Sequence, residues 1–331
     1  MSAARPISVH ERRRAWAALS LPRPAPSTVT IVAIFVAICI WGVTTTHGFA
    51  TLANVQAILT SSAFVGVIAI GMTLIMVSGY VFSMSLGLTA AVLAIAFLYG
   101  LRLGIVLDVL LVLVLGAMIC AVQGWIVGGL AANPIIVTIA AGVVQEGLTL
   151  YLTHGTTVYP PAGDKSYLFL THTVADIPVP FLVFLGLAIA TDLLLRRTRF
   201  GRQVYAVGEN KPAARAAAIS VPSVATGVFA LAGVATGAAG ILLGAFNQNA
   251  TLSIQSTFTY DAIAAALVGG TAVTGGRGSA SRTLFGAVVI ATISSLLLLH
   301  GYSTGVQILV KGMIVLVVVA IVQLGGGERR R

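Results

Sequence analysis

The sequence predicts an all-α polytopic membrane protein with about ten transmembrane helices and both termini in the cytoplasm. Of its 331 residues, 58% are hydrophobic and only 8% are charged, whereas a soluble domain carries about 25% charged residues. No charged side chain occurs in the 78 residues from Pro24 to Leu101. This stretch is far longer than the ~7–15 apolar residues of a signal peptide, so Thr28–His47 is expected to be a retained first helix.

The apolar runs are broken by Gly, Pro and charged residues at intervals that match the length of a membrane span. A span needs about 20 apolar residues, so ten spans occupy most of the chain and leave no separate soluble domain. The predicted spans are residues 28–47, 55–78, 82–100, 104–129, 134–153, 178–195, 223–246, 258–274, 283–300 and 304–324. Residues 28–324 therefore form the transmembrane domain, with cytoplasmic tails at 1–27 and 325–331.

The basic residues predict the orientation of these spans. Lys and Arg collect in cytoplasmic loops, and an inner N-terminus places 16 of the 19 basic residues on the cytoplasmic side. They are Arg5, Arg12, Arg13, Arg14 and Arg23, then Arg196, Arg197, Arg199, Arg202, Lys211 and Arg215 in loop 196–222, then Arg277, Arg282, Arg329, Arg330 and Arg331. Only Arg102 and Lys165 fall outside, the latter in the outer loop 154–177. The net charge of +10 therefore records orientation in the lipid bilayer, and no nucleic-acid partner is expected.

The sequence lacks the residues that several functional classes of protein require. Cys39 and Cys120 both lie inside apolar runs, which favours packing over a disulfide. The histidines match no metal-ligand spacing. No P-loop of the form G-x-x-x-x-G-K-[ST] occurs, so the chain does not bind ATP by that route. We therefore predict no catalytic, cofactor-binding or metal-binding residues, and the protein is not expected to be an enzyme.

The cytoplasmic loop 196–222 contains a segment suited to contact another protein. Asn210 can cap a short helix, and Pro212 fits the first turn, where a missing N–H costs nothing. Alanines 213, 214, 216, 217 and 218 favour helix and leave its surface smooth. Such a helix could press into a groove on a partner. The alternative is a solvated loop that merely obeys the positive-inside rule, which composition alone favours.

Small residues predict close helix packing in two spans. Glycines 233, 237, 240 and 244 recur at i, i+4, i+7 and i+11, on one face of the seventh span. Gly124 and Gly128 form a second small pair in the fourth span. We interpret both sets as helix contacts, with a flat pore wall as the alternative.

Four stretches resemble the permease subunits of ribose-type ATP-binding-cassette (ABC) importers. They occur in the order of that family and span about residues 55–323. The segment Thr198–Ile219 matches its pattern T-x-F-G-R-x-x-Y-A-x-G-x-N-x-x-A-A-x-x-x-G-I except for Ala218. The others are Gly71–Leu74, Asn133–Thr138, and Tyr260–Thr271 followed by Gly275–Ser279.

The resemblance implies a permease subunit in a bacterial inner membrane that carries a small polar solute, above all a sugar. It also implies partners: cytoplasmic ATP-binding cassette subunits, an external solute-binding protein and a second permease subunit. Contact with the cassettes is expected at Gly208, Asn210, Ala213, Ala214, Arg215 and Ile219. The alternatives are a permease for branched-chain amino acids and an ion-coupled secondary transporter, whose coupling carboxylate would be Glu146.

The candidates for the solute pathway are Thr73, Glu146, Asp261 and Thr271. A charge inside a span costs about 2.5–3.5 kcal/mol on insertion scales, so each needs a reason. Glu146 departs from the family pattern, which favours a pathway role. Asp261 could instead cap its helix, and Lys311 could meet a carboxylate; for these two the structural interpretation is preferred.

Overall fold

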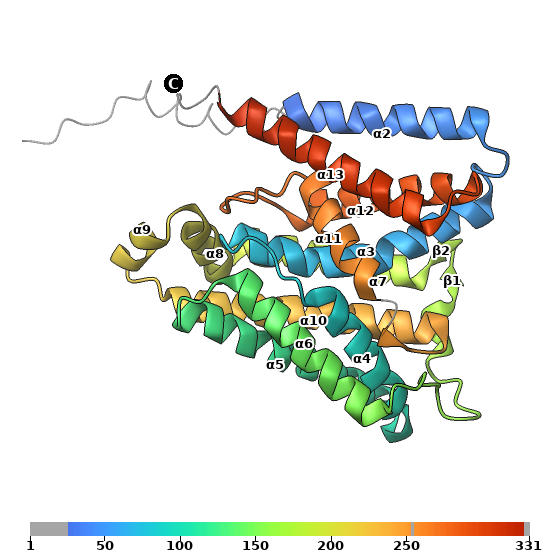
Figure 1. Cartoon of the computed structure of the whole chain (residues 1–331), viewed down its shortest axis with the longest axis horizontal. Coiled ribbons are helices and arrows are strands. Elements are labelled where there is room, and N and C mark those ends of the chain that lie inside the picture. Colours follow the sequence, from blue (N-terminus) through green and yellow to red (C-terminus); the bar gives the residue numbers. More distant parts are fainter. Residues whose placement is uncertain (1–25, 253–254, 328–331) are drawn as a thin grey trace, which may run out of the picture.

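The computed structural model describes residues 26–252 and 255–327, which form a bundle of long helices (Figure 1). The helices are α2 (Pro26–Thr45), α3 (Leu52–Val77), α4 (Leu86–Gly100), α5 (Ile105–Gly129), α6 (Pro134–Thr153), α7 (Val179–Arg197), α8 (Arg199–Glu209), α9 (Lys211–Ala216), α10 (Val221–Asn247), α11 (Gln255–Val268), α12 (Ala280–Leu299) and α13 (Thr304–Gly327). Two short 3-10 helices, η1 (Leu101–Leu103) and η2 (Leu168–Thr171), and one antiparallel hairpin, β1 (Thr173–Val174) with β2 (Ile177–Pro178), complete the described part.

The all-α polytopic class is confirmed. In the described part of the chain, seven helices are long and apolar enough to cross a membrane. The other predicted spans coincide with α2, α11 and α13, where the apolar stretches are shorter: Phe35–Thr45, Thr257–Val268 and Thr304–Ile314. The number ten and the orientation stay predictions. Most of the N-terminal tail, with Arg5 to Arg23, and the arginines 329–331 lie outside the described residues.

Two predicted boundaries are wrong. The third span, predicted from residue 82, becomes helical only at Leu86. The eighth, predicted to reach residue 274, ends at Val268. In the second case the reason is backbone conformation: Gly270, Gly275 and Gly276 have φ of +79°, +88° and +70°, which a helix does not accommodate.

Helix α3 lies at the centre of the bundle. Of its most apolar 18-residue stretch 89% is buried, against 22% for α5 and 17% for α6. It contacts α7, α10, α11 and α12, and Figure 1 shows α3 and α10 passing through the middle while α2 and α13 lie along one edge. The exposed faces of α5 and α6 are apolar, so they suit contact with the acyl chains of lipid.

The glycine face of α10 packs closely against α4 and α5, as predicted. A Cβ on Gly237 would lie 3.3 Å from Cα of Leu113 in α5, and one on Gly240 only 2.8 Å from the carbonyl oxygen of Ala90 in α4. A Cβ on Gly233 would collide with the carbonyl oxygen of Gly116. Gly124 and Gly128 approach Phe229 and Ala225 in the same way. The small residues thus let the backbones of neighbouring helices touch.

This packing predicts opposite effects for two Gly→Ala substitutions. Gly233→Ala should lower the free energy of unfolding by about 1–3 kcal/mol, because the methyl group meets backbone that cannot yield. Gly147→Ala in α6 should be neutral or stabilising, because nothing lies within 4 Å of its Cβ position and Ala is the better helix former. Thermal unfolding in detergent measures both. Equal effects of the two substitutions would contradict the packing argument.

Candidate functional site

Two side chains cap the short helices of loop 196–222. The Thr198 hydroxyl accepts a hydrogen bond from the Gly201 N–H (3.0 Å) at the start of α8. Asn210 Oδ1 accepts one from the Ala213 N–H (3.0 Å) at the start of α9, and Pro212 lies in the first turn. The short helix and the Asn210 cap predicted from the sequence are therefore confirmed. A cap of this kind contributes about 1 kcal/mol to the stability of its helix.

Helix α9 presents only one of its two central alanines to solvent. Ala213 is exposed, together with Pro212 and Arg215, whereas Ala214 is 3% exposed and belongs to the hydrophobic core of the bundle. The prediction that Ala214 contributes to a contact surface is therefore wrong, because its methyl group is already covered by its own chain. The surface available to a partner is centred on Ala213.

The inner end of α3 and the end of α8 meet at four glycines, which we call the glycine junction: Gly79, Gly208, Gly275 and Gly276. A Cβ on Gly79 would lie 3.1 Å from Cα of Gly208, and one on Gly275 would lie 2.6 Å from Cα of Gly79. The N–H of Gly276 donates a hydrogen bond to the Val77 carbonyl oxygen (2.9 Å). Three segments distant in sequence thus pack backbone against backbone at Gly79, Gly208 and Gly275, and Gly276 lies against Glu209.

Side chains reinforce the junction. The Tyr205 hydroxyl donates to the carbonyl oxygen of Gly278 (2.8 Å), which ties α8 to the loop before α12. Lys211 Nζ lies 3.8 Å from the centre of the Tyr80 ring, a cation–π contact between α9 and the segment after α3. Burial, and then the positive charge of Arg215, lower the pKa of the Lys211 ammonium group.

Asp192 links α7 to the same region. Its Oδ1 accepts a hydrogen bond from the Ala280 N–H (2.8 Å) at the start of α12, and its Oδ2 lies 3.4 Å from the Arg196 guanidinium. A carboxylate at a helix N-terminus is favoured by the unpaired N–H groups and the helix dipole. The ends of α3, α7, α8 and α12 are therefore joined at the side of the bundle that carries α9.

The four pathway candidates lie on different elements of the bundle. The Thr73 hydroxyl is buried and lies 2.6 Å from that of Thr283, which joins α3 to α12. Thr271 is buried in the turn after α11, and its hydroxyl has no hydrogen-bond partner among the described residues. Glu146 is half-buried on α6. Their roles in transport stay predictions.

Asp261 is held by Lys311. Lys311 Nζ donates to Asp261 Oδ2 at 2.8 Å, and the two side chains are only 13% and 11% exposed. The pair joins α11 to α13, so each charge has the partner that an apolar environment requires. A structural role for Asp261 and Lys311 explains both residues without a pathway function.

Sequence reasoning overlooked a buried polar network around the start of α4. The Ser85 hydroxyl donates to Gln123 Oε1 (2.8 Å), and the Thr89 hydroxyl donates to Gln145 Oε1 (2.9 Å). The Thr138 hydroxyl accepts from the Met84 N–H (3.0 Å). With 15 residues, α4 reaches about 22 Å, less than the ~30 Å of a bilayer core. The network supplies hydrogen bonds to the non-helical residues just before Leu86, which extend the short helix α4 toward the full thickness of the bilayer core.

Two acidic residues were also overlooked. Asp108 in α5 is 1% exposed, and Asp192 has the contacts given above. Both lie within predicted spans, so an acidic side chain in an apolar run was the signal that could have identified them. Across residues 26–252 and 255–327, no three His, Cys, Asp or Glu side chains gather as metal ligands would.

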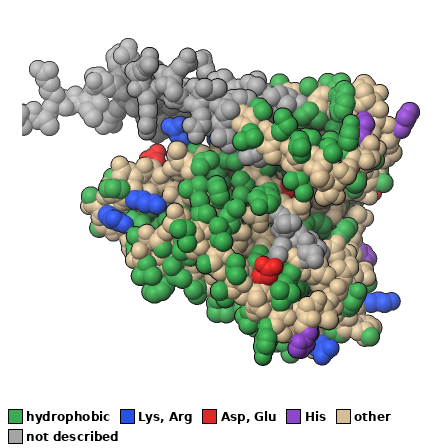
Figure 2. Space-filling model, in the orientation of Figure 1, with side chains coloured by type: hydrophobic (Ala, Val, Ile, Leu, Met, Phe, Trp, Pro, Cys, Tyr) green, Lys and Arg blue, Asp and Glu red, His purple; other side chains and the backbone are tan. Residues whose placement is uncertain are grey.

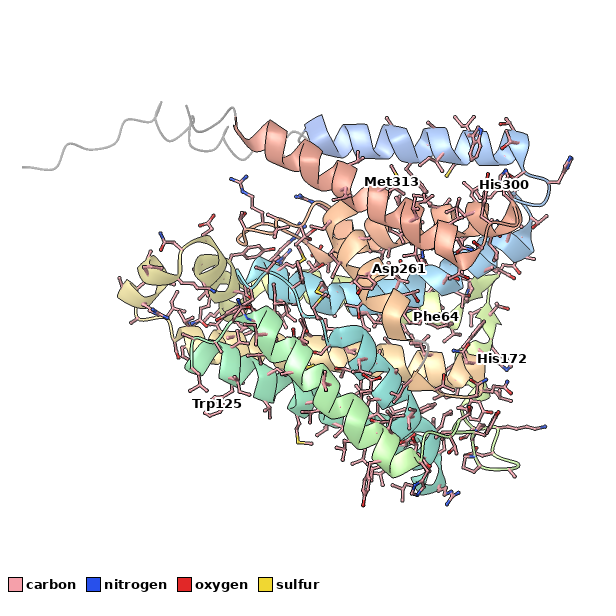
Figure 3. The ribbon with its side chains drawn as sticks, in the orientation of Figure 1. Phe64, Trp125, His172, Asp261, His300 and Met313 are labelled. Carbon is pink, nitrogen blue, oxygen red and sulfur yellow. The ribbon has the colours of Figure 1, made fainter. Side chains whose placement is uncertain are left out.

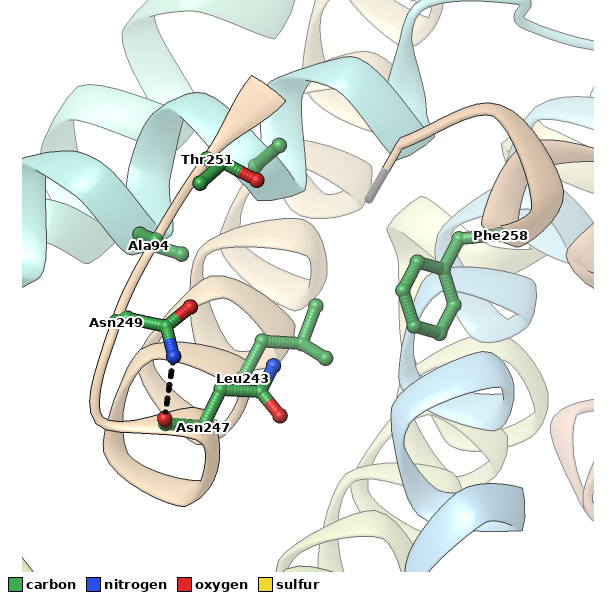
Figure 4. A pocket seen from close by; sticks show the side chains of 8 residues that line it. Ala94, Leu243, Asn247, Asn249, Thr251 and Phe258 are labelled. Atoms are coloured by element: carbon green, nitrogen blue, oxygen red, sulfur yellow. Dashed lines mark hydrogen bonds between the residues drawn. The ribbon is translucent and has the colours of Figure 1, made fainter. Parts of the chain in front are cut away.

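A pocket at the outer end of α10 is too small for a solute (Figure 4). Ala94, Leu243 and Phe258 are among its lining residues, and its volume is about 10 Å³. That is room for about one water molecule. The Asn249 side chain closes one side by donating to the Asn247 carbonyl oxygen (3.0 Å).

The Asp261–Lys311 pair gives a prediction about stability. Lys311→Met should destabilise the protein by about 3–5 kcal/mol, because it leaves a buried carboxylate without its partner. The exchange Asp261→Lys with Lys311→Asp should recover part of that loss. Thermal unfolding in detergent measures both variants. An exchange variant no more stable than Lys311→Met would show that the pair does not hold α13 in place.

Comparison with known proteins identifies the family. The family described as branched-chain amino acid transport system / permease component matches residues 54–320. The ribose import permease protein RbsC of Escherichia coli K12 is 32% identical over 298 residues, covering 88% of this chain and 92% of that protein. RbsC of Bacillus subtilis 168 is also 32% identical, covering 80% and 83%.

A third relative, the xylose transport system permease protein XylH of E. coli K12, is 27% identical and covers 87% of this chain and 90% of its own length. No solved structure matches significantly. The resemblance first indicated by the motifs at Gly71–Leu74 and Thr198–Ile219 is thus confirmed over most of the chain. The chain belongs to the family of branched-chain amino acid transport system permease components and is a multi-pass membrane permease.

Proposed function

We propose that this chain is the transmembrane subunit of an ABC importer for a sugar, in which the exposed face of α9 receives the movement of a cytoplasmic ATPase. The observation that carries the proposal is the position of α9, whose Ala213 is exposed. Lys211 of α9 contacts Tyr80 after α3, and Tyr205 of the adjoining α8 donates a hydrogen bond to Gly278 before α12. The ribose and xylose permeases among the relatives support the choice of a sugar.

Ten spans with both termini in the cytoplasm fit this role. Figure 2 shows basic side chains near α8 and α9, and others beside the histidines at the opposite end of the molecule. A cytoplasmic α8–α9 end is favoured by number, since six basic residues lie in loop 196–222 and only Arg102 and Lys165 fall on the predicted outer side. A cassette subunit would then dock from the same side as Arg199, Arg202 and Arg215.

The glycine junction supplies a means of transmission. Packed backbones have little compressibility, so displacement of α8 must displace Gly79 at the end of α3 and the loop at Gly275. The hydrogen bond from Tyr205 to Gly278 makes the start of α12 move in the same direction. We infer that closure of the cassettes moves α3 and α12 together, and that Asn210 and Ile219 set the position of α9.

The remaining partners of the proposal are a second permease subunit and an external solute-binding protein. The outer loop 154–177 offers the latter an ordered surface. Val158 and Ala250 exchange backbone hydrogen bonds (3.1 and 2.9 Å), and Tyr167 is buried. Tyr159 and Phe169, 67% and 54% exposed, are the apolar residues that a docking protein would cover.

Uptake measurements test the substrate class and the energy source. The chain is reconstituted with a cassette ATPase and a binding protein from the same organism and offered labelled D-ribose, D-xylose or L-leucine. We expect ATP-dependent uptake of a sugar that a protonophore leaves unchanged. Uptake of leucine would favour an amino-acid permease. Uptake without ATP that the protonophore abolishes would favour ion coupling through Glu146.

Ala213 provides the sharpest test of the contact with the ATPase. Ala213→Glu should reduce uptake and stimulated ATP hydrolysis by at least about tenfold, because a bulky charge would be buried unpaired at the interface. Ala213→Ser is the conservative control and should stay within about twofold of wild type. Both proteins should reach the membrane in normal amounts. Normal uptake with Ala213→Glu would refute the assignment.

Tyr205→Phe tests transmission through the junction. The variant loses one hydrogen bond, worth about 1 kcal/mol, and keeps the ring. We expect an assembled importer that hydrolyses ATP at the wild-type rate but moves fewer sugar molecules per ATP. The ratio of the two rates is the measurement. Tyr151→Phe, at an exposed position of α6, is the matched control, and equal ratios in both variants would contradict the role of Tyr205.

A further inference from the structure

An open groove lies at the outer end of α3. Its volume is about 410 Å³, within the ~300–1,000 Å³ of small-molecule sites. Gln56, Thr60, Ser61 and Phe64 of α3 form one wall, and Phe246 of α10 and Thr171 of η2 lie across from them. Figure 3 labels Phe64 and His172 toward the same end of the bundle, that of the β1–β2 hairpin.

The groove uncovers part of α3, the most buried of the long helices. From Ser62 to Val77 every residue of α3 is covered, whereas Ala57 and Ser61 are exposed. Along the groove α3 carries Gln56, which is half-buried, Thr60, which is buried, and Ser61, which is exposed. Polar side chains at membrane depth avoid lipid and face protein or water. The exposed face of α3 therefore suits a polar occupant rather than acyl chains.

The chemistry of the lining fits a neutral polyhydroxylated molecule. The Thr60 and Thr171 hydroxyls donate to backbone carbonyls (2.8 Å each), so their oxygens are left to accept hydrogen bonds from a ligand. Phe64 and Phe246 meet edge to face with ring centres 5.3 Å apart and provide an apolar surface for the C–H face of a ring. Sugars present hydroxyl groups around an apolar ring face, which this combination matches.

Charge distinguishes a sugar from an amino acid at this site. None of the residues that line the groove is Asp, Glu, Lys or Arg. A zwitterion would have to leave water for a site with no ionic partner, which is costly. A neutral solute avoids that cost. The uncharged lining therefore favours a neutral solute over a zwitterion such as leucine, independently of the relatives.

We propose that this groove is the site at which the permease receives a neutral monosaccharide from the outer side, with Ser61 and the Thr60 oxygen as hydrogen-bonding groups and Phe246 as a stacking surface. The proposal rests on the proposed function. It adds a location, a set of residues and a reason for the selection of neutral solutes.

The first experiment blocks the groove in the complete importer. Ser61→Trp should reduce uptake of labelled D-ribose or D-xylose, whichever the wild type carries, by at least about tenfold, because the indole fills the space. Ser303→Trp, at an exposed position in the turn between α12 and α13, is the control and should stay within about twofold. Size-exclusion chromatography shows whether the variants assemble like the wild type.

The outcomes separate the two proposals. Wild-type protein that carries neither sugar would overturn the proposed function. If the wild-type protein transports a sugar and uptake by Ser61→Trp stays within about twofold of the wild-type rate, the groove proposal alone is overturned. Loss of permease dimers in Ser61→Trp would assign the groove to the subunit interface and also overturn it.

A labelling experiment keeps the proposal testable if Ser61→Trp fails to fold. Ser61→Cys is introduced into protein with Cys39→Ala and Cys120→Ala and treated from outside with a membrane-impermeant thiol reagent. The transported sugar at saturating concentration should slow modification by at least about threefold while leaving Ser303→Cys, in the exposed turn between α12 and α13, unaffected. Equal slowing at both positions, no slowing, or a disulfide between two copies at position 61 would refute the proposal.

Discussion

The contact of backbone with backbone at Gly79, Gly208 and Gly275 is the interaction on which the end of the structure near α8 and α9 depends. A methyl group at any of these positions would meet main-chain atoms within about 3 Å, so the ends of α3 and α8 and the turn at Gly275 pack main chain against main chain. Such a contact cannot absorb a displacement by a change of rotamer. Whatever moves α8 must therefore move α3 and the turn before α12, or separate them.

The lipid environment explains most of the polar contacts elsewhere. In a bilayer, every polar group that lacks an internal partner costs several kcal/mol. Asp261 meets Lys311, Thr73 meets Thr283, and the chain before α4 is bonded by Gln123 and Thr138. Each contact joins two helices, so the requirement for hydrogen bonds also fixes how the helices are arranged.

The sequence predicted the parts of the structure that depend on local chemistry. Apolar length located the long helices, the spacing of Gly233 to Gly244 predicted a packed face, and Asn210 with Pro212 predicted α9. It could not predict that Ala214 is buried, since this depends on which side of α9 rests on the bundle. Nor could it pair Tyr205 with Gly278, 73 residues away. The breaks before Leu86 and after Val268 were missed because apolar residues continue through both.

Helix α3 connects the two ends of the proposed mechanism. Its outer part lines the groove at Ser61, its middle is bonded to α12 through Thr73, and its inner end reaches the glycine junction. From Ser61 to Val77 the helix rises about 24 Å, and its interior contains no proline that would bend it. A helix of this kind moves as a rod. A displacement imposed on α9 by a cassette subunit therefore reaches the groove directly, and a solute that alters the groove alters the same rod, which makes the coupling of the two ends reciprocal.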